Sequence, residues 1–399
     1  MSMKILLCSE SYPPVTSGVS VSVYRLALGM QARGHEVQVL TPHQPHDQEA
    51  DQTSLLPIHR LPSQPNPFRK GYRFSAPAVR RITSIIASFQ PDIIHVHDIG
   101  LTCRIAVSVG RRRDIPVVAT HHFIAEGLME YYFPMSGVVS GAVLPVITGS
   151  VTRLYNRCQR VAVPTEFMHR YLKTWPSLRT PVQVISNGVD TARFKPDLDE
   201  YQRTAVKLRY GIPLQAPLLG YVGRIDPEKN LEIVLRALAT LGQDTTLHLV
   251  MAGRGNLVEQ YKALAHDLGI AERVTWLPPL AYDDPEFPAF FGILDVFCIP
   301  SPNETESMVT LEAMACGLPI IAADKGPLLE LVDDQNGAAL DPRNIALWAD
   351  TLTLILTLPA TERRRLGAVS RTRAEERGLT ASLDLWEQVY TEEIASANL

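Results

Sequence analysis

The chain has 399 residues, of which 46% are hydrophobic and 20% charged. This composition can bury the cores of two or three ordinary domains, and it excludes disordered, collagen-like and coiled-coil proteins. The five cysteines form no C-x-x-C or C-x-x-H pair, which argues against a disulfide framework or a zinc site and favours a reducing, cytoplasmic compartment. The N-terminal apolar stretch is too short for a signal peptide, and the weakly polar run 137–151 falls short of the roughly 20 residues that span a membrane.

The formal net charge of −4 is distributed unevenly along the chain. Residues 1–183 contain 19 basic and 11 acidic side chains, a balance of +8, whereas residues 184–399 contain 19 and 31, a balance of −12. Much of the positive charge lies in clusters with interleaved aromatic residues: Phe68, Arg69, Lys70, Tyr72, Arg73, Phe74, Arg80, Arg81, Arg111–Arg113, Arg153, Arg157 and Arg160. Such a face suits an anionic membrane surface. Solvated helices with arginines for a phosphorylated substrate remain an equal alternative, whereas nucleic acid is disfavoured because the whole chain is acidic.

Short apolar runs alternate with longer amphipathic stretches, as in parallel strands joined by crossover helices. The first half contains predicted strands at 4–8, 36–41, 92–97, 116–121, 160–165 and 181–186. The second half contains predicted strands at 218–223, 246–253, 273–278, 295–300 and 319–324. Helical periodicity fills the gaps, for example at 19–33, and a last helix is predicted over 379–394. We therefore predict an α/β fold with two doubly wound parallel sheets.

A polar segment containing proline, residues 187–200, separates the two series of strands and is predicted to be a linker. It divides the chain into an N-terminal domain at 1–184 and a C-terminal domain at 185–379. In open parallel sheets, ligands bind outside the carboxyl ends of the strands. Two such domains therefore predict a two-part site in a cleft beside the linker.

The stretch 299–324 predicts a phosphate site. A strand ends at Pro300, a polar loop follows, and an apolar helix then runs to about Cys316. The backbone N–H groups of Ser307, Met308 and Val309 would lie at the N-terminus of this helix, where free donors and the helix dipole favour an anion.

Two carboxylates flank that predicted phosphate site. Glu304 precedes the helix and could accept hydrogen bonds from sugar hydroxyls, while Glu312 could accept them from a second pair such as a ribose diol. The alternative is structural: Glu304 or Glu306 caps the helix, and Glu312 pairs with a cation.

A second stretch, 221–238, places two cations after a strand. Arg224 follows the strand directly and Lys229 begins the next helix, an arrangement that suits a diphosphate. Alternatively, Asp226 and Glu228 neutralise both cations in a surface turn. Because both stretches fall in one predicted domain, the phosphate interpretation is favoured.

These stretches resemble motifs of the retaining family-4 glycosyltransferases of the GT-B fold. Residues 304–319, ETESMVTLEAMACGLP, resemble the E-x7-E signature, and GRIDPEKN resembles the diphosphate motif. VISNGVDTARF resembles the linker motif, AGRG the G-x-G turn, and residues 10–41 the opening strand, glycine loop and helix. The family's Phe-Gly after the first glutamate is absent here. The resemblance implies two Rossmann-like domains, with a helix at 380–399 returning to the N-terminal domain.

The resemblance also implies roles for individual residues. Arg224 and Lys229 would hold the donor diphosphate, Glu304 the donor sugar and Glu312 the ribose. The donor would also meet the backbone at the glycines and the helix N-terminus: Gly18, Gly253, Ser307, Met308 and Val309. His122 would lie near the reacting centre, and the acceptor side would be lined by His97, His121 and Glu126.

The implied reaction transfers a hexose, glucose above all, from a nucleotide sugar such as UDP-glucose to a hydroxyl, with retention and without a metal ion or other cofactor. The N-terminal sequence resembles diacylglycerol glucosyltransferases and phosphatidylinositol mannosyltransferases. It therefore implies a membrane lipid acceptor and peripheral association with the inner face of the cell membrane, with segment 126–158 in the interface. The alternatives are a soluble sugar or sugar-phosphate acceptor, a non-catalytic nucleotide-sugar-binding protein, and a nucleotide-sugar epimerase.

Overall fold

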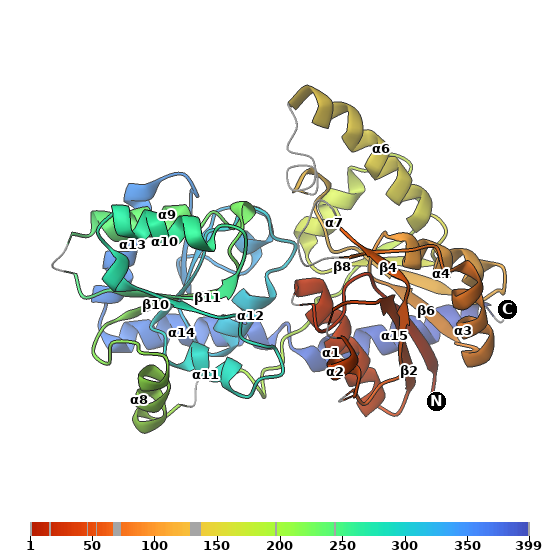
Figure 1. The fold of residues 1–399 in the computed structure, drawn as a ribbon, viewed down its shortest axis with the longest axis horizontal. Coiled ribbons are helices and arrows are strands. Elements are labelled where there is room, and N and C mark those ends of the chain that lie inside the picture. Colours follow the sequence, from red (N-terminus) through yellow and green to blue (C-terminus); the bar gives the residue numbers. More distant parts are fainter. Residues whose placement is uncertain are drawn as a thin grey trace. The chain divides into compact units, whose positions relative to one another are not determined.

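A computed structural model shows two α/β units (Figure 1). Unit 1 comprises Met1–Asn187 and Thr380–Leu399, and unit 2 comprises Gly188–Leu379. The predicted boundaries lie at 184/185 and 379/380. The structure describes residues 2–15, 17–45, 47–52, 54–66, 73–127, 137–195, 198–242 and 245–397, without the side chains of 49, 50 and 137–142.

Unit 1 is built on a seven-stranded parallel sheet of order β3-β2-β1-β6-β7-β8-β9. Its strands are β1 (Lys4–Cys8), β2 (Glu36–Pro42), β3 (Ile58–Leu61), β6 (Ile93–Val96), β7 (Val117–Thr120), β8 (Arg160–Val163) and β9 (Val182–Val184). A separate antiparallel hairpin pairs β4 (Ser63–Pro65) with β5 (Arg73–Ser75). The strand order reverses between β1 and β6, so a ligand would be expected at the carboxyl ends of these two strands.

Helices cover both faces of this sheet. They are α1 (Gly18–Ala32), α2 (Asp47–Gln52), α3 (Val79–Phe89), α4 (Leu101–Arg111), α6 (Gly137–Tyr155), α7 (Glu166–Lys173) and the returning α15 (Leu379–Ala397). Apolar side chains of α3, α4, α6 and α7 pack in one cluster with Ile94 and Val96 of β6. His95, between them, points to the opposite face, where its ring contacts Trp386 and Tyr390 of α15.

Unit 2 is built on a six-stranded parallel sheet of order β12-β11-β10-β13-β14-β15. The strands are β10 (Leu218–Arg224), β11 (His248–Arg254), β12 (Val274–Leu277), β13 (Val296–Ile299), β14 (Ile320–Ala323) and β15 (Gly337–Leu340). In chain order this is the 3-2-1-4-5-6 arrangement of a Rossmann fold. Its switch point lies between β10 and β13.

The helices of unit 2 lie on both faces of its sheet (Figure 1). Helices α9 (Glu232–Thr240), α10 (Val258–Asp267) and α13 (Ile345–Thr357) cover one face, and α11 (Glu286–Gly292), α12 (Met308–Ala315) and α14 (Ala360–Glu375) the other. Helix α8 (Glu200–Arg209) packs on α11, and short 3-10 turns η1 (Pro227–Lys229), η2 (Ala271–Arg273) and η3 (Gly326–Glu330) complete the unit. The core is apolar on both sides of the strands, as expected for a parallel sheet.

The fold confirms the α/β prediction and adds to it. All eleven predicted strands are present, but the edge strands β3 and β15 and the β4–β5 hairpin were not predicted. The predicted linker is not an exposed segment between the two units, because part of it is packed into unit 2. Its residues Val189 and Phe194 are fully buried in the core of unit 2, and the guanidinium of Arg371 donates to the carbonyls of Thr191 and Phe194.

The described residues include no helix that is long and apolar enough to cross a membrane. The weakly polar run 137–151 lies within α6, whose N-terminal end extends away from the rest of unit 1 (Figure 1). Phe68, Arg69, Lys70 and Tyr72, part of the predicted basic and aromatic face, lie outside the described residues, as do residues 128–136 of the segment predicted to meet a membrane.

Candidate functional site

The two motifs of unit 2 meet at the switch point of its sheet. Arg224 ends β10 and Lys229 ends η1, while Glu304 lies in the loop after β13. Lys229 Nζ donates to Glu304 Oε1 at 2.6 Å, and Ser301 Oγ donates to the carbonyl of Glu228 at 3.3 Å. Two stretches separated by some 75 residues in the sequence therefore form one polar cluster.

The cations of this cluster are already paired with carboxylates. Arg224 donates to Asp226 Oδ2 at 2.6 Å and also to Glu228. The second oxygen of Asp226 accepts from the backbone N–H of Asn256 at 2.8 Å, which ties the loop after β10 to the loop after β11. The structural alternative for Arg224, neutralisation by Asp226 and Glu228, thus describes the contacts present in this structure.

The Lys229–Glu304 pair is largely shielded from water. Its side chains are only 16% and 11% exposed. Water can hydrate neither charge well, so each charge depends on the other for compensation. Burial raises the pKa of Tyr221 well above its usual value, and the negative charge of Glu304 adds to that effect. An anionic ligand could replace Glu304 as the partner of Lys229 and leave the carboxylate free for hydroxyl groups.

Close backbone contacts between β10 and β11 explain the glycines of the AGRG turn. A Cβ on Gly253 would lie 1.9 Å from the carbonyl oxygen of Gly223, and one on Gly255 would lie 2.1 Å from that of Ile225. Gly253 was predicted to bind the donor, and the structure gives it a packing role as well. The same register sets Arg254 opposite Arg224.

Arg254 is a candidate that the sequence analysis missed. It is exposed at the carboxyl end of β11, and no carboxylate among the described residues pairs with it. The signal lay in the sequence, since Arg254 falls inside AGRG. Only the strand register shows that it shares an edge with Arg224.

Helix α12 begins where the sequence analysis expected its N-terminus. Ser307 is the N-cap, with a left-handed backbone (φ 72°), and its hydroxyl lies 2.7 Å from Thr310 Oγ1. The N–H groups of Met308 and Val309 have no acceptor among the described residues. Glu312, on the next turn, is almost fully buried.

The carboxyl edge of the unit 1 sheet carries a pair of histidines. His97 follows β6 and His122 follows β7, and His97 Nδ1 lies 3.3 Å from His122 Nε2. Burial lowers the pKa of His122 to about 4 and that of His97 well below its usual value. His122, predicted near the reacting centre, and His97, predicted to line the acceptor side, are therefore neighbours. Both rings are neutral near pH 7.

Two partly buried carboxylates at the same edge were not predicted. Glu10 accepts from the backbone N–H of Thr102 at 2.8 Å and from Ser75 Oγ at 2.6 Å. Asp98 accepts from Ser9 Oγ and from the backbone N–H of Glu10, both at 2.7 Å. Burial and the nearby Glu10 raise the pKa of Asp98 to about 7. Glu10 thereby caps the N-terminus of α4, which lacks a side-chain cap of its own.

The remaining predicted residues of unit 1 differ in accessibility. Gly18 is exposed as the first residue of α1. Glu126 accepts a hydrogen bond from the hydroxyl of Tyr171 at 2.6 Å. His121 is fully buried, and its Nδ1 lies 2.8 Å from the hydroxyl of Tyr155. In this structure its side chain is therefore not accessible to an acceptor, although the residue was predicted to line the acceptor side.

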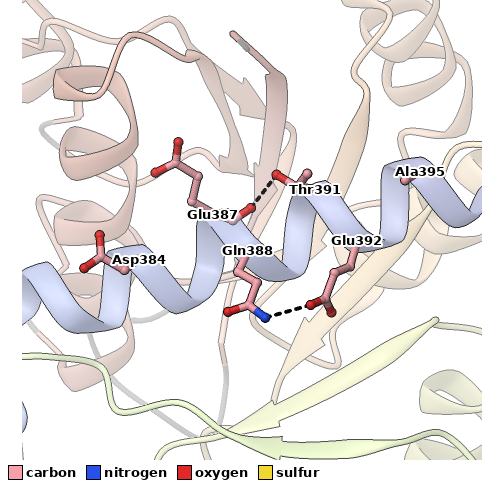
Figure 2. A pocket seen from close by; sticks show the side chains of 6 residues that line it. All are labelled: Asp384, Glu387, Gln388, Thr391, Glu392 and Ala395. Atoms are coloured by element: carbon pink, nitrogen blue, oxygen red, sulfur yellow. Dashed lines mark hydrogen bonds between the residues drawn. The ribbon is translucent and has the colours of Figure 1, made fainter.

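A shallow open depression of about 500 Å³ runs along α15 (Figure 2). It is lined by Asp384, Glu387, Gln388, Thr391, Glu392 and Ala395. Its carboxylates already have partners within unit 1, because Arg33 pairs with Asp384 and Glu387, and Arg160 pairs with Glu392. This surface therefore anchors the returning helix.

Two parallel-sheet α/β units with these switch points are the architecture of a GT-B glycosyltransferase. The structure is similar to HepE of Anabaena solved with UDP, with a TM-score of 0.77 and 19% identity, covering 98% of this chain and 100% of that chain. It is also similar to sucrose-phosphate synthase of Thermosynechococcus elongatus, with a TM-score of 0.77 and 20% identity over the same shares.

Residues 16–193 match the family model described as Glycosyltransferase Family 4, and residues 202–373 match Glycosyl transferases group 1. The chain is 30% identical to a GDP-mannose-dependent alpha-mannosyltransferase of Mycolicibacterium smegmatis, covering 92% of each chain. It is 28% identical to a D-inositol 3-phosphate glycosyltransferase of Xylanimonas cellulosilytica (93% of this chain, 91% of that one). It is 27% identical to the alpha-monoglucosyldiacylglycerol synthase of Streptococcus pneumoniae (85% and 75%). The chain belongs to the family-4 glycosyltransferases.

Proposed function

We propose that this protein is a retaining hexosyltransferase that transfers glucose from UDP-glucose to a hydroxyl of a membrane lipid such as diacylglycerol, without a metal ion. The observation that carries the transfer is the contact between Lys229 and Glu304, because it joins the diphosphate motif and the first glutamate of E-x7-E. A HepE structure with UDP-glucose and the monoglucosyldiacylglycerol synthase support the choice of donor and acceptor.

In the proposed reaction the bond between the hexose C1 and the diphosphate oxygen breaks, and a new bond forms between C1 and the oxygen of the acceptor hydroxyl. Negative charge grows on the leaving diphosphate, which takes up the proton of that hydroxyl. Arg224, Lys229 and the exposed Arg254 would stabilise that charge, with the free N–H groups at the start of α12. Donor binding would release Lys229 from Glu304, so a single exchange frees the cation for phosphate and the carboxylate for sugar hydroxyls. Glu312 would contact the ribose, and His122 the transferred hexose.

The lipid acceptor is supported by an uncompensated basic surface, which we call the α4–α6 arginines: Arg111, Arg112, Arg113, Arg153 and Arg157. Helices α4 and α6 are neighbours, since Arg104 of α4 donates to Ser150 of α6. Near their C-terminal ends, Ser108 of α4 accepts from both Arg112 and Arg157. These arginines form no ion pair with a described residue. Asp114 is the only carboxylate between residues 99 and 125, and residues 137–165 contain none. A surface of this charge favours anionic headgroups.

Exposed apolar groups lie on the same helix as Arg153. Val146 of α6 is 65% exposed, and the adjacent Pro145 is exposed as well. Exposed apolar side chains next to arginines are typical of a helix that rests in a membrane interface. The combination supports docking of unit 1 on an anionic bilayer, where a lipid acceptor would be found.

A second candidate is transfer to a soluble phosphorylated acceptor. It is favoured by the similarity to D-inositol 3-phosphate glycosyltransferases, and the α4–α6 arginines would then bind a phosphate. A nucleotide-sugar epimerase would instead change the donor with no acceptor present. A non-catalytic binding protein would hold the donor unchanged.

Flotation with liposomes of increasing anionic content, followed by incubation with labelled UDP-glucose or GDP-mannose, tests these proposals. We expect anion-dependent flotation and a labelled glycolipid from UDP-glucose. Glu304→Ala should abolish the product and keep flotation, whereas Arg112→Gln/Arg113→Gln should reduce flotation. In parallel incubations with a soluble inositol phosphate and with no acceptor, label found only on the inositol phosphate would favour the second candidate, and conversion of the donor alone would favour an epimerase.

A matched control uses another adjacent pair of exposed arginines. Arg364→Gln/Arg365→Gln on α14 of unit 2 removes the same charge from a different surface. Flotation of this variant should equal that of the parent protein. An equal loss in both variants would mean that net charge alone, and not the α4–α6 surface, drives binding.

A further inference from the structure

Three histidine rings form a row in unit 1. His95 and His97 are two residues apart at the end of β6, so their side chains lie on the same face of the strand. Their ring centroids are 3.9 Å apart. His97 Nδ1 in turn lies 3.3 Å from Nε2 of His122, with the two ring planes 19° apart. Among the described residues, Nε2 is the one ring nitrogen of His122 that has a hydrogen-bond partner.

The inner ring of this row is fixed from both sides. His95 Nδ1 lies 2.7 Å from the hydroxyl of Tyr390 on α15, and His95 Nε2 lies 2.7 Å from Thr120 Oγ1 on β7. The indole of Trp386 packs on the same ring, with centroids 4.2 Å apart. The ring of His97 is 2% exposed and lies against that of His95 with the two planes tilted by 34°, so it is held by a ring that is itself hydrogen-bonded on both sides.

The contact between His97 and His122 can contain only one hydrogen. Burial lowers the pKa values of both rings, so near pH 7 each is neutral and carries a single N–H. Two N–H groups facing each other would repel, and so would two lone pairs. One facing nitrogen is therefore a donor and the other an acceptor.

The two possible arrangements differ at the far nitrogens. If His122 Nε2 donates, the hydrogen of His97 lies on its own Nε2. That atom is buried and has no partner among the described residues. If His97 Nδ1 donates, its Nε2 carries only a lone pair, and the hydrogen of His122 lies on Nδ1. Buried N–H groups without an acceptor are rare in proteins, and unsatisfied acceptors are less so. The second arrangement is therefore favoured.

We propose that His97 is a positioning residue that fixes His122 as the Nδ1–H tautomer, so that His122 presents an N–H donor to an oxygen of the bound substrate. Nδ1 of His122 has no hydrogen-bond partner among the described residues, which leaves that donor for a ligand. In this role His122 binds a hydroxyl or phosphate oxygen and does not accept a proton. That the ligand is the transferred hexose or the leaving diphosphate rests on the proposed function.

Long-range ¹H–¹⁵N correlation spectra of the full chain, labelled with ¹⁵N-histidine, test the tautomer directly. The His122 signals are assigned by their absence from the spectrum of His122→Gln. We expect Nδ1 of His122 in the protonated range and Nε2 in the unprotonated range at pH 7. A proton on Nε2 would overturn the proposal, with no enzymatic assay involved.

Two substitutions of His97 separate positioning from packing. His97→Asn keeps an N–H donor near the place of Nδ1 and should keep the His122 tautomer and a kcat/KM within about threefold of the parent value. His97→Leu removes the donor, so His122 should no longer be restricted to the Nδ1–H tautomer. We expect kcat/KM to fall about tenfold to hundredfold, as is typical when a group that orients a functional histidine is lost. An unchanged His122 tautomer in His97→Leu would refute the role of His97.

The control is His248→Leu, which removes a buried histidine of unit 2 whose ring has one hydrogen-bond partner among the described residues, Thr275. It should leave the His122 spectrum unchanged. Failure of the parent protein to transfer sugar from any donor would reject the proposed function. The tautomer measurement would still decide the role of His97.

Discussion

The pairing of Lys229 with Glu304 leads to an unusual expectation for nucleotide binding. Without a ligand, Lys229 Nζ is paired with Glu304 Oε1 at 2.6 Å. A diphosphate that binds Lys229 must therefore compete with Glu304 for this cation. Glu304→Gln removes the competing charge and keeps the shape of the side chain. We therefore expect this variant to bind UDP more tightly than the parent protein while losing transfer activity.

The size of the effect follows from the exposure of the pair. A fully exposed ion pair contributes at most about 1 kcal/mol. The side chains of Lys229 and Glu304 are only 16% and 11% exposed, so we take about 1 kcal/mol as the contribution of their pairing. Freeing Lys229 from it should tighten UDP binding about threefold to tenfold. Lys229→Met should have the opposite effect. It removes a charge-assisted hydrogen bond of about 1.5–3 kcal/mol and so weakens UDP binding about tenfold to hundredfold.

The free energy of unfolding gives a second test of the Lys229–Glu304 pair. Lys229→Met leaves the Glu304 carboxylate largely buried without its cation, and we expect a loss of about 2–3 kcal/mol in urea unfolding. The double variant removes both charges and should regain about half or more of that loss. This coupling would identify the contact as a real interaction in solution.

Isothermal titration with UDP and urea unfolding of the four proteins make the test. The matched control is Lys262→Met with Glu259→Gln, an exposed pair on α10 whose atoms lie 2.9 Å apart. Both control variants should bind UDP as the parent does. If Glu304→Gln weakened UDP binding as much as Lys229→Met, Glu304 would not compete for the cation, and our account of this edge as a diphosphate site would be wrong.

Three further expectations concern the scaffold. Gly29→Ala should lose about 1–3 kcal/mol of unfolding free energy in urea, because the new Cβ would lie 2.5 Å from Leu383 Cδ1, and Leu383→Ala in the same chain should restore part of it. Ser307→Gly should be more stable than Ser307→Ala by about 1 kcal/mol in the same assay, since only alanine places a Cβ on the left-handed backbone at φ 72°. Asp98→Asn should gain stability relative to the parent between pH 5 and pH 8. The folded parent keeps the Asp98 proton up to about pH 7, whereas the unfolded chain loses it near 3.8, so parent stability falls over that window. An unchanged difference between pH 5 and pH 8 would contradict this.

The sequence predicted the central strands because each is an apolar run bounded by polar turns. It also predicted β9 and β12, each at one edge of its sheet, but not β3 and β15 at the opposite edges, and the reason is visible in the residues of these two strands. Strand β3 (IHRL) contains His59 and Arg60, which bond Gln38 and Asp51, and β15 (GAAL) consists of small residues. Neither pattern differs from that of a loop until a neighbouring strand supplies hydrogen bonds.

The site was predictable to the extent that it follows from position along single strands. Arg224, Lys229 and Glu304 come at the ends of strands that the order 3-2-1-4-5-6 makes neighbours, so the switch-point rule brings them together. Arg254 lies inside the AGRG motif, but only the strand register shows that it shares an edge with Arg224. The contact of Glu10 with the start of α4 depends on the path of that helix, for which a single sequence carries no signal.

The returning helix accounts for part of the charge asymmetry found in the sequence. Residues 380–399 contribute four carboxylates to unit 1, which lowers its balance from +8 to +4 and raises that of unit 2 from −12 to −8. Those carboxylates do not spread over the surface. They pair with Arg33 and Arg160. The positive charge that remains is therefore concentrated on the α4–α6 arginines, where Asp114 is the one acidic residue nearby in the sequence. Removal of this cluster should change binding to anionic surfaces far more than removal of any other pair of arginines in the described chain.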